Sequence, residues 1–167
     1  ATAQFAAIPL NLTAPGAVVD YVNTGTWSTK AIAEAKRYCK VNVVADASAT
    51  KFTTVPAEAG WQRSPEAAYL HYTPNETIHG VEFPFVPEAR GIPLVADLSS
   101  TILSRPIDVS RFGVIYAGAQ KNIGPAGLVV VIVREDLLGK ARPDTPTVFD
   151  WKAMAADGSM LNTPATY

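Results

Sequence analysis

Residues 113–133 read GVIYAGAQKNIGPAGLVVVIV and carry the most specific signal in the chain. Two apolar runs rich in β-forming residues, 113–116 and 128–133, enclose a loop of small residues that holds one lysine, Lys121. Small residues leave room for a flat ligand close to the backbone. An amine beside apolar strands loses solvation, which favours its neutral, nucleophilic form. The sequence therefore predicts chemistry at Lys121, with a solvated loop lysine between two core strands as the alternative.

A second apolar run, 93–97, ends in a carboxylate, Asp97, and is followed by LSSTILSRP at 98–106. Ligands bind at the carboxyl ends of the central strands of an α/β sheet. On neighbouring strand ends, Asp97 and Lys121 would supply the two groups that a pyridoxal phosphate site needs. These are an amine for the cofactor aldehyde and a carboxylate that keeps the pyridine nitrogen protonated. The alternative for Asp97 is the cap of a turn or helix, a common role for Asp after a strand.

The rest of the chain alternates between strand-like and helix-like patterns. Strands are expected at 16–22, 41–45, 67–72, 93–97, 113–116 and 128–133, and helices at 1–10, 28–38, 134–140 and 151–156. No internal repeat is present. This alternation predicts an α/β fold with a mostly parallel central sheet flanked by helices.

Composition limits the possible compartments and partners. With 48% hydrophobic residues in 167, the chain can form one domain with a sizeable core. A formal net charge of −1 gives no support for a nucleic-acid or membrane partner, although an anionic small-molecule substrate stays possible. The single cysteine, Cys39, looks structural, and no metal-ligand spacing is present, so we expect no metal site. Without a signal peptide or a run of 18 apolar residues, the chain is expected to be cytoplasmic.

Three motifs closely resemble those of the phosphoserine aminotransferases, a family of fold-type I pyridoxal phosphate enzymes. They read HYTPNETIHG at 71–80, DLSSTILSRPIDVS at 97–110 and YAGAQKNIGPAG at 116–127. They follow the family's order with nearly its spacing, and the likeness extends over the whole chain. The resemblance implies that residues 1–167 form part of the large cofactor-binding domain. It implies an internal portion of a longer enzyme, without the family's N-terminal segment and small C-terminal domain.

The resemblance also implies which residues act. Lys121 would hold the cofactor aldehyde and move the substrate's α-proton, and Asp97 would keep the ring nitrogen protonated. Ser99 would support these groups. The implied cofactor contacts are Ala1, Thr2, Trp27, Thr77, Asp97, Gln120, Lys121, Asn162 and Thr163.

The resemblance gives the other contacts on this subunit separate roles. Trp27 would stack on the pyridine ring, and Thr77 would hydrogen-bond near the phenolic oxygen. Ala1, Thr2 and Gln120 would hold the phosphate, at a helix N-terminus that favours an anion. Judged alone, Trp27 would be assigned to core packing and Thr2 to an ordinary first helical turn.

Asn162 and Thr163 match a pair that reaches the phosphate of the opposite subunit in the family's homodimer. Alone, they would be assigned to a surface turn. Many relatives carry an arginine at the position of Thr2, which puts that part of substrate recognition in question. His71 is interpreted as a packed strand residue and His79 as a loop residue.

The implied activity is amino-group transfer from L-glutamate to 3-phosphohydroxypyruvate, giving O-phospho-L-serine and 2-oxoglutarate in serine biosynthesis. For a bacterial protein, the resemblance also implies the phosphohydroxythreonine step of pyridoxine biosynthesis. Two alternatives stay open. One is another class V aminotransferase, acting on alanine, serine or glyoxylate. The other is a non-catalytic fragment that keeps only the cofactor-domain fold.

Overall fold

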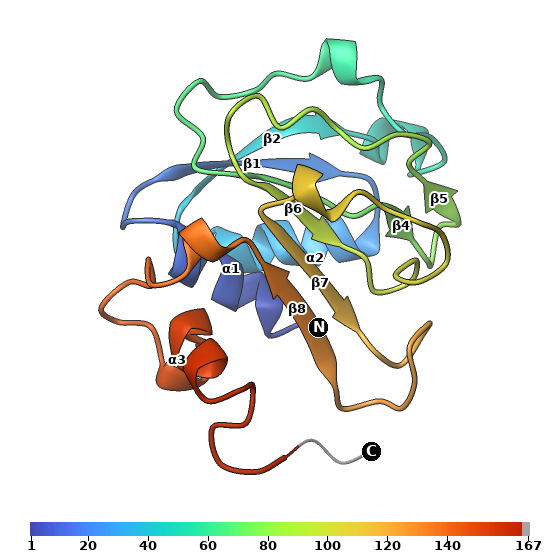
Figure 1. Cartoon of the computed structure of the whole chain (residues 1–167). Helices are drawn as coiled ribbons and strands as arrows, with labels where there is room; N and C mark the ends of the chain where they lie inside the picture. Colours follow the sequence, from blue (N-terminus) through green and yellow to red (C-terminus); the bar gives the residue numbers. More distant parts are fainter. Residues whose placement is uncertain (165–167) are drawn as a thin grey trace.

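Six strands form the central sheet of the computed structural model, in the order β2-β1-β3-β6-β7-β8 (Figure 1). Their bounds are β1 Val18–Asn23, β2 Lys40–Asp46, β3 Leu70–Tyr72, β6 Leu94–Asp97, β7 Val114–Gly118 and β8 Val129–Val133. Every pairing is parallel except that of β7 with β8, which is antiparallel. The structure describes residues 1–164. The predicted mostly parallel sheet is confirmed.

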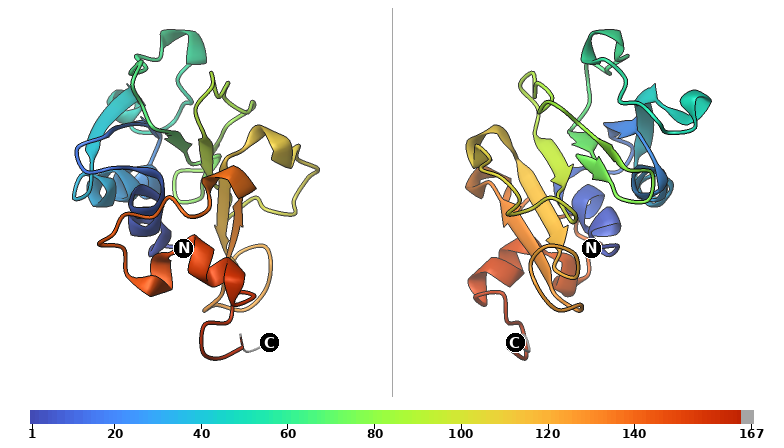
Figure 2. Two further views of the ribbon diagram at one scale, coloured as in Figure 1. Left: turned by 60° about the vertical axis from the view of Figure 1, so that its left-hand side comes forward. Right: turned by 90° about the vertical axis from the view of Figure 1, so that its right-hand side faces the viewer.

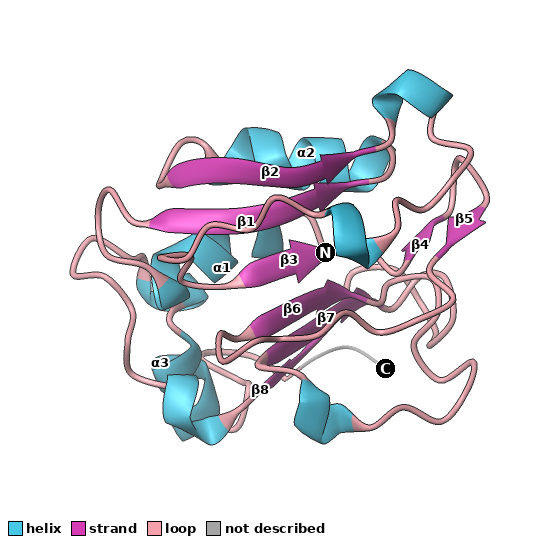
Figure 3. Cartoon of the chain, turned by 90° about the horizontal axis from the view of Figure 1, so that it is seen from above, coloured by secondary structure: helices cyan, strands magenta, loops and turns pink. Residues whose placement is uncertain are grey.

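Three α-helices lie on one face of this sheet. They are α1 Gln4–Leu12, α2 Thr26–Ala35 and α3 Trp151–Ala156. Side chains from all three share one buried cluster with the sheet, and Figure 3 shows α1 and α2 running along the strands. In Figure 2, the N-terminus lies close to the loop that follows β7. That placement brings residue 1 to the carboxyl end of the sheet.

The opposite face is covered by irregular segments and not by helices. Short 3-10 turns lie among these segments at Ser48–Thr50, Glu58–Gly60 and Val109–Arg111, and a small hairpin pairs β4 Asn75–Glu76 with β5 Val81–Glu82. Two further 3-10 turns, Glu135–Leu137 and Thr147–Phe149, lie on the helix side of the sheet. Trp61 and Phe83, from two of the covering segments, pack in a second buried cluster on this face. Prolines at 56, 65, 84 and 87 interrupt helix formation in these segments. Helices therefore flank the sheet on one side only.

Alternation along the strands explains the two clusters. Val114 and Tyr116 of β7 belong to the cluster under the helices, whereas Ile115 and Ala117 belong to the other. Successive side chains of a strand point to opposite faces, so a strand buried on both faces is apolar throughout. All residues of β3, β6 and β7 are buried. These three strands form the rigid centre that carries the site.

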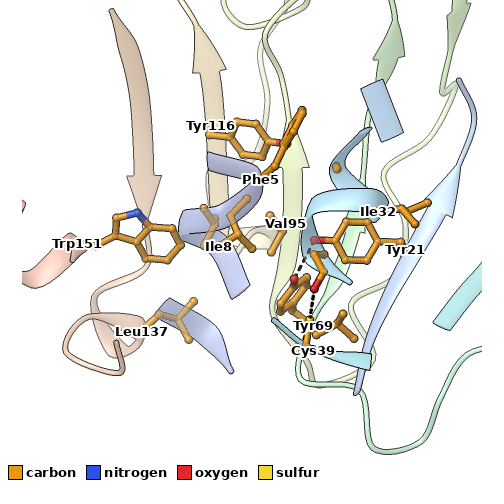
Figure 4. Packing of buried hydrophobic residues seen from close by; sticks show 14 residues of the cluster. Phe5, Ile8, Tyr21, Ile32, Cys39, Tyr69, Val95, Tyr116, Leu137 and Trp151 are labelled. Carbon is orange, nitrogen blue, oxygen red and sulfur yellow. Dashed lines mark hydrogen bonds between the residues drawn. The ribbon is translucent and has the colours of Figure 1, made fainter. Parts of the chain in front are cut away.

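The polar groups of Tyr21, Tyr69 and Cys39 inside the helix-side cluster are paired (Figure 4). The hydroxyl oxygens of Tyr21 and Tyr69 lie 2.8 Å apart, and both side chains are fully buried. Cys39 donates from its thiol to the carbonyl of Ala35 at 3.2 Å. Burial raises the pKa of the Cys39 thiol to about 11. Cys39 is thus structural, as predicted.

Some predicted boundaries were wrong. The helix predicted at 134–140 is only the turn Glu135–Leu137, because the backbone is already extended at Leu138, with φ −70° and ψ 145°. The strand predicted at 67–72 begins only at Leu70, and the β4-β5 hairpin was not predicted. No helix in the described part of the chain is long and apolar enough to cross a membrane.

Asn11 holds α3 against α1. Its side chain, 2% exposed, donates to the carbonyls of Ala7 and Phe149 and accepts from the backbone of Trp151. We predict that Asn11→Ala lowers the free energy of unfolding by about 1–3 kcal/mol, because buried backbone groups lose their partners. Urea denaturation measures this. The exposed Gln62→Ala serves as control, with an expected change within about 0.5 kcal/mol. Equal effects of the two substitutions would contradict the assignment.

Candidate functional site

A pocket opens at the carboxyl end of the parallel strands. It is lined by Ala1, Thr2, Phe5, Trp27, Thr73, Asn75, Asp97, Ser99, Ser100, Gln120 and Lys121. Six of the nine predicted cofactor contacts are in this lining, and so is Ser99, which was predicted to support them. They come from the turn before α1, the first turn of α2, the end of β6 and the loop after β7. The fold therefore brings together residues separated by as many as 120 positions.

Asp97 ends β6 at the floor of the pocket, with 5% of its surface exposed. Its Oδ1 accepts hydrogen bonds from the backbone N–H of Ser99 at 3.0 Å and from its hydroxyl at 2.5 Å. The same hydroxyl accepts from the N–H of Gly118 at 3.0 Å and so joins the ends of β6 and β7. Asp97 thus caps a turn, which was the alternative role, and also lines the pocket.

Burial raises the pKa of the Asp97 carboxyl above its ordinary value. The hydrogen bonds from Ser99 and the positive charge of Lys121 act in the opposite direction without cancelling this effect. A carboxylate in such a position is stabilised by a cationic N–H donor placed beside it.

Lys121 lies in the loop between β7 and β8. Its Nζ donates to Thr77 Oγ1 at 2.7 Å and lies 5.0 Å from the ring centroid of Trp27. The side chain is exposed, so the expected loss of solvation at this amine was wrong for the chain as described. The glycine-rich loop keeps the amine in solvent because it extends beyond the sheet. A hydroxyl and an aromatic face now hold the amine instead.

Trp27 stands in the first turn of α2, as predicted, and forms one wall of the pocket. Its backbone N–H donates to Glu76 Oε2 at 2.9 Å, and that of Ser28 donates to Oε1 at 2.8 Å. Sequence reasoning missed Glu76. Its position next to Thr77 in the 71–80 motif was the available signal, whereas its partners lie 49 and 48 positions earlier.

The residues predicted to hold a phosphate, Ala1, Thr2 and Gln120, line the pocket. The first helix begins at Gln4 and not at residue 1, and Ala1 and Thr2 form the turn before it. Ala1 is half-buried, and Thr2 and Gln120 are exposed. Gln120 folds over Gly118, where a Cβ would lie 2.6 Å from its Oε1. Backbone N–H groups and one amide are therefore available to an anion here.

Three further residues of the 71–100 region line the pocket and were not predicted as contacts: Thr73, Asn75 and Ser100. Ser100 donates to Asn75 Oδ1 at 3.1 Å. All three belong to motifs that the sequence singled out, but no local pattern distinguishes them from neighbouring turn residues.

Asn162 and Thr163 do not line the pocket. Both are exposed and follow α3. Because their expected contact is with the cofactor of a second subunit, a single chain does not bring them to the site. That assignment stays a prediction.

His71 is fully buried in β3, as predicted. Its Nε2 lies 2.9 Å from the hydroxyl of Tyr116, and its ring stacks on Tyr21 at 4.6 Å. Burial lowers the pKa of His71 to about 3, so the ring is neutral at ordinary pH. His79 lies in the turn after β4 against Phe52 and outside the pocket lining, which agrees with its interpretation as a loop residue.

A mostly parallel sheet with a lysine and a buried aspartate at neighbouring strand ends defines the fold class of the fold-type I pyridoxal phosphate transferases. The chain belongs to the aminotransferase class-V family, whose model matches residues 1–162.

Within this family, the chain is similar to relatives and solved structures that are named phosphoserine aminotransferases. The chain is 62% identical to a phosphoserine aminotransferase from Pseudomonas entomophila over 167 residues, covering 100% of this chain and 46% of the relative. The phosphoserine aminotransferase structure from Bacillus circulans subsp. alkalophilus superposes with a TM-score of 0.94 at 45% identity, over 98% of this chain and 45% of that one. A phosphoserine aminotransferase with bound PLP, from Trichomonas vaginalis, has a TM-score of 0.89 at 42% identity, over 99% and 47%. The chain spans about half the length of the curated relatives it matches.

Asp97 makes stability depend on pH in a defined direction. The folded chain holds the Asp97 proton more tightly than the unfolded chain, so ionising this group costs folding free energy. The cost is absent below the unfolded pKa, appears as pH rises past it and is complete above the raised folded pKa. Asp97→Asn removes it. We predict that this variant matches the parent at acidic pH and exceeds its stability as pH rises to neutral.

Urea denaturation of the cofactor-free protein between pH 3 and pH 8 tests this, with the parent and the variant measured side by side. Asp157→Asn is a matched exposed control, since Asp157 lies at the surface after α3. If the difference in unfolding free energy between the parent and Asp97→Asn stays constant over this pH range, ionisation of Asp97 does not lower the stability of the folded chain.

Proposed function

We propose that this chain is the core of the cofactor domain of a phosphoserine aminotransferase that binds pyridoxal 5'-phosphate in the pocket. The proposed reaction moves an amino group from L-glutamate to 3-phosphohydroxypyruvate and yields O-phospho-L-serine and 2-oxoglutarate. The observation that carries the proposal is the meeting of Lys121, Asp97 and Trp27 at one pocket. Relatives about 60% identical bear the name of this activity.

The residues present fit such a cofactor. Asp97 is a buried carboxylate with a raised pKa, which a protonated ring nitrogen would stabilise. Thr73 Oγ1 and Trp27 Nε1 are buried polar atoms in the wall without a hydrogen-bond partner in residues 1–164. The indole of Trp27 offers a flat face for ring stacking. Ala1, Thr2 and Gln120 would hold the phosphate at the rim.

Each residue would then have a defined task. Bound here, the cofactor supplies an electrophilic aldehyde and a ring that accepts electrons. Lys121 Nζ would be the nucleophile that binds the aldehyde and, when released, the base that moves the proton of the substrate's α-carbon. Thr77 orients that amine through its hydroxyl. Asp97 would keep the ring nitrogen protonated, and Ser99 fixes the orientation of Asp97.

The proposal extends to assembly and compartment. Exposed Asn162 and Thr163 would bind the cofactor phosphate of the other subunit of a homodimer. A net charge near zero and one buried cysteine are consistent with a reducing cytoplasm. The small-molecule substrates and the roles in serine and pyridoxine biosynthesis follow from the same proposal.

Trapping with borohydride tests the lysine assignment. The intact protein is incubated with pyridoxal phosphate, reduced and mapped by mass spectrometry. We predict one stable label, on Lys121, because this amine alone is held beside both Thr77 and Trp27. Lys121→Ala should remove it. Lys30→Ala is the matched control, since Lys30 Nζ also lies 5.0 Å from the Trp27 ring but outside the pocket lining.

Labelling of Lys30, or undiminished labelling of the Lys121→Ala variant, would show that the pocket does not direct the cofactor to Lys121. Absence of any label in the parent would favour a protein that retains only the fold.

Substrate choice separates this proposal from other class V aminotransferases. We predict that the intact, cofactor-loaded protein forms 2-oxoglutarate from L-glutamate with 3-phosphohydroxypyruvate as acceptor, and that glyoxylate is at least about 100-fold poorer in kcat/KM. A missing phosphate leaves the groups built to bind it unpaired, which costs this much discrimination. A coupled assay for 2-oxoglutarate measures both acceptors. A preference for glyoxylate, or for alanine as donor, would contradict the proposed substrate class.

A further inference from the structure

Glu76, the last residue of β4, is a fully buried carboxylate. No lysine, arginine or histidine forms an ion pair with it among residues 1–164. Its two oxygens instead accept the backbone N–H groups of Trp27 and Ser28, at 2.9 Å and 2.8 Å. A buried charge is costly unless it is paired or hydrogen-bonded. These two hydrogen bonds therefore fix the position of the Glu76 carboxylate.

The two N–H groups are those that a helix cap normally satisfies. Gly25 is the N-cap of α2, which makes Trp27 and Ser28 the second and third helical residues. A capping side chain binds the N–H of these positions, but Gly25 has no side chain. Glu76 therefore caps α2 from a different part of the chain. A negative charge at this end is also favoured by the helix dipole.

Gly25 leaves the space that this contact needs. A Cβ placed on Gly25 would lie 2.6 Å from Cδ of Glu76 and 2.7 Å from its Oε2. The φ of Gly25 is 167°, an extended value that any residue can adopt. Glycine is therefore required here for close approach of the carboxylate and not for backbone conformation.

The residue after Glu76 completes the link to the pocket. Thr77 accepts a hydrogen bond from Lys121 Nζ, and that atom lies 5.0 Å from the ring of Trp27. Two consecutive residues of the β4-β5 hairpin therefore contact the two sides of one site. Glu76 fixes the backbone that carries the aromatic wall, and Thr77 fixes the amine.

We propose that Glu76 is a positioning residue, which caps α2 from the hairpin and thereby fixes the ring of Trp27 relative to Lys121. Its significance for cofactor binding rests on the function proposed above. Its effect on Trp27 does not, because every contact involved lies within the cofactor-free chain.

The test uses Glu76→Gln in the intact protein labelled with 5-fluorotryptophan. The fluorine resonance of Trp27 is assigned by its loss in Trp27→Phe. The amide can accept only through one oxygen, so we expect the Trp27 resonance to shift or broaden. We also expect pyridoxal phosphate to bind about tenfold more weakly, the effect of losing one charge-assisted hydrogen bond. Asp150→Asn is the matched control, because Asp150 caps α3 through the N–H of Lys152, away from the pocket.

The outcomes separate the two proposals. If the parent binds pyridoxal phosphate but Glu76→Gln changes neither the Trp27 resonance nor the affinity, the positioning role is wrong and the proposed function stands. If the parent does not bind pyridoxal phosphate, the proposed function fails, and the Trp27 resonance alone decides the role of Glu76.

Gly25→Ala provides a second test should Glu76→Gln fail to fold. The added methyl would displace the Glu76 carboxylate, because it needs the space that the carboxylate occupies. It should therefore also shift the Trp27 resonance. Gly60→Ala is its control, since no atom lies within 4 Å of a Cβ built there. An unchanged Trp27 resonance in Gly25→Ala would overturn the proposal.

Discussion

The parallel pairing of β6 with β7 is the constraint on which the rest of the site depends. Their register sets Asp97 opposite Tyr116, and the hydroxyl of Ser99 connects Asp97 to the N–H of Gly118 at the end of β7. The chain beyond Gly118 then forms the loop that carries Lys121 before it returns as β8 on the other side of β7. Because β6 and β7 are adjacent and end at the same edge of the sheet, Asp97 and Lys121 line one pocket.

The site combines a buried carboxylate with an exposed amine, and the chemistry of each is consistent with its placement. The carboxylate is at the end of a strand buried on both faces, where its position is fixed by packing. The amine is on an exposed loop, and only a threonine and an aromatic ring hold it. A group that orients a ligand benefits from rigidity, whereas a group that forms and breaks a covalent bond must move.

Much of this arrangement could be predicted from the sequence, and the failures have physical causes. The strands that carry Asp97 and Lys121 were found because apolar patterns are local, and strand ends indicate ligand sites. Trp27 and Thr77 were assigned through the family resemblance alone. Glu76 was missed because its hydrogen-bond partners are 48 and 49 positions away. The exposure of Lys121 agrees with the alternative of a solvated loop lysine and not with the expected loss of solvation, since the small residues around it do not reveal how far a loop extends from its sheet.

The buried row Tyr21, His71 and Tyr116 beneath the pocket has a consequence for how titrations of this protein are interpreted. Burial lowers the pKa of His71 to about 3 and raises the pKa of both tyrosines above their ordinary value. None of the three changes charge between mildly acidic and mildly basic solution. These three residues therefore add no titration step over that range. A bell-shaped or sigmoidal profile recorded there would have its origin in other groups of the protein or in its ligand.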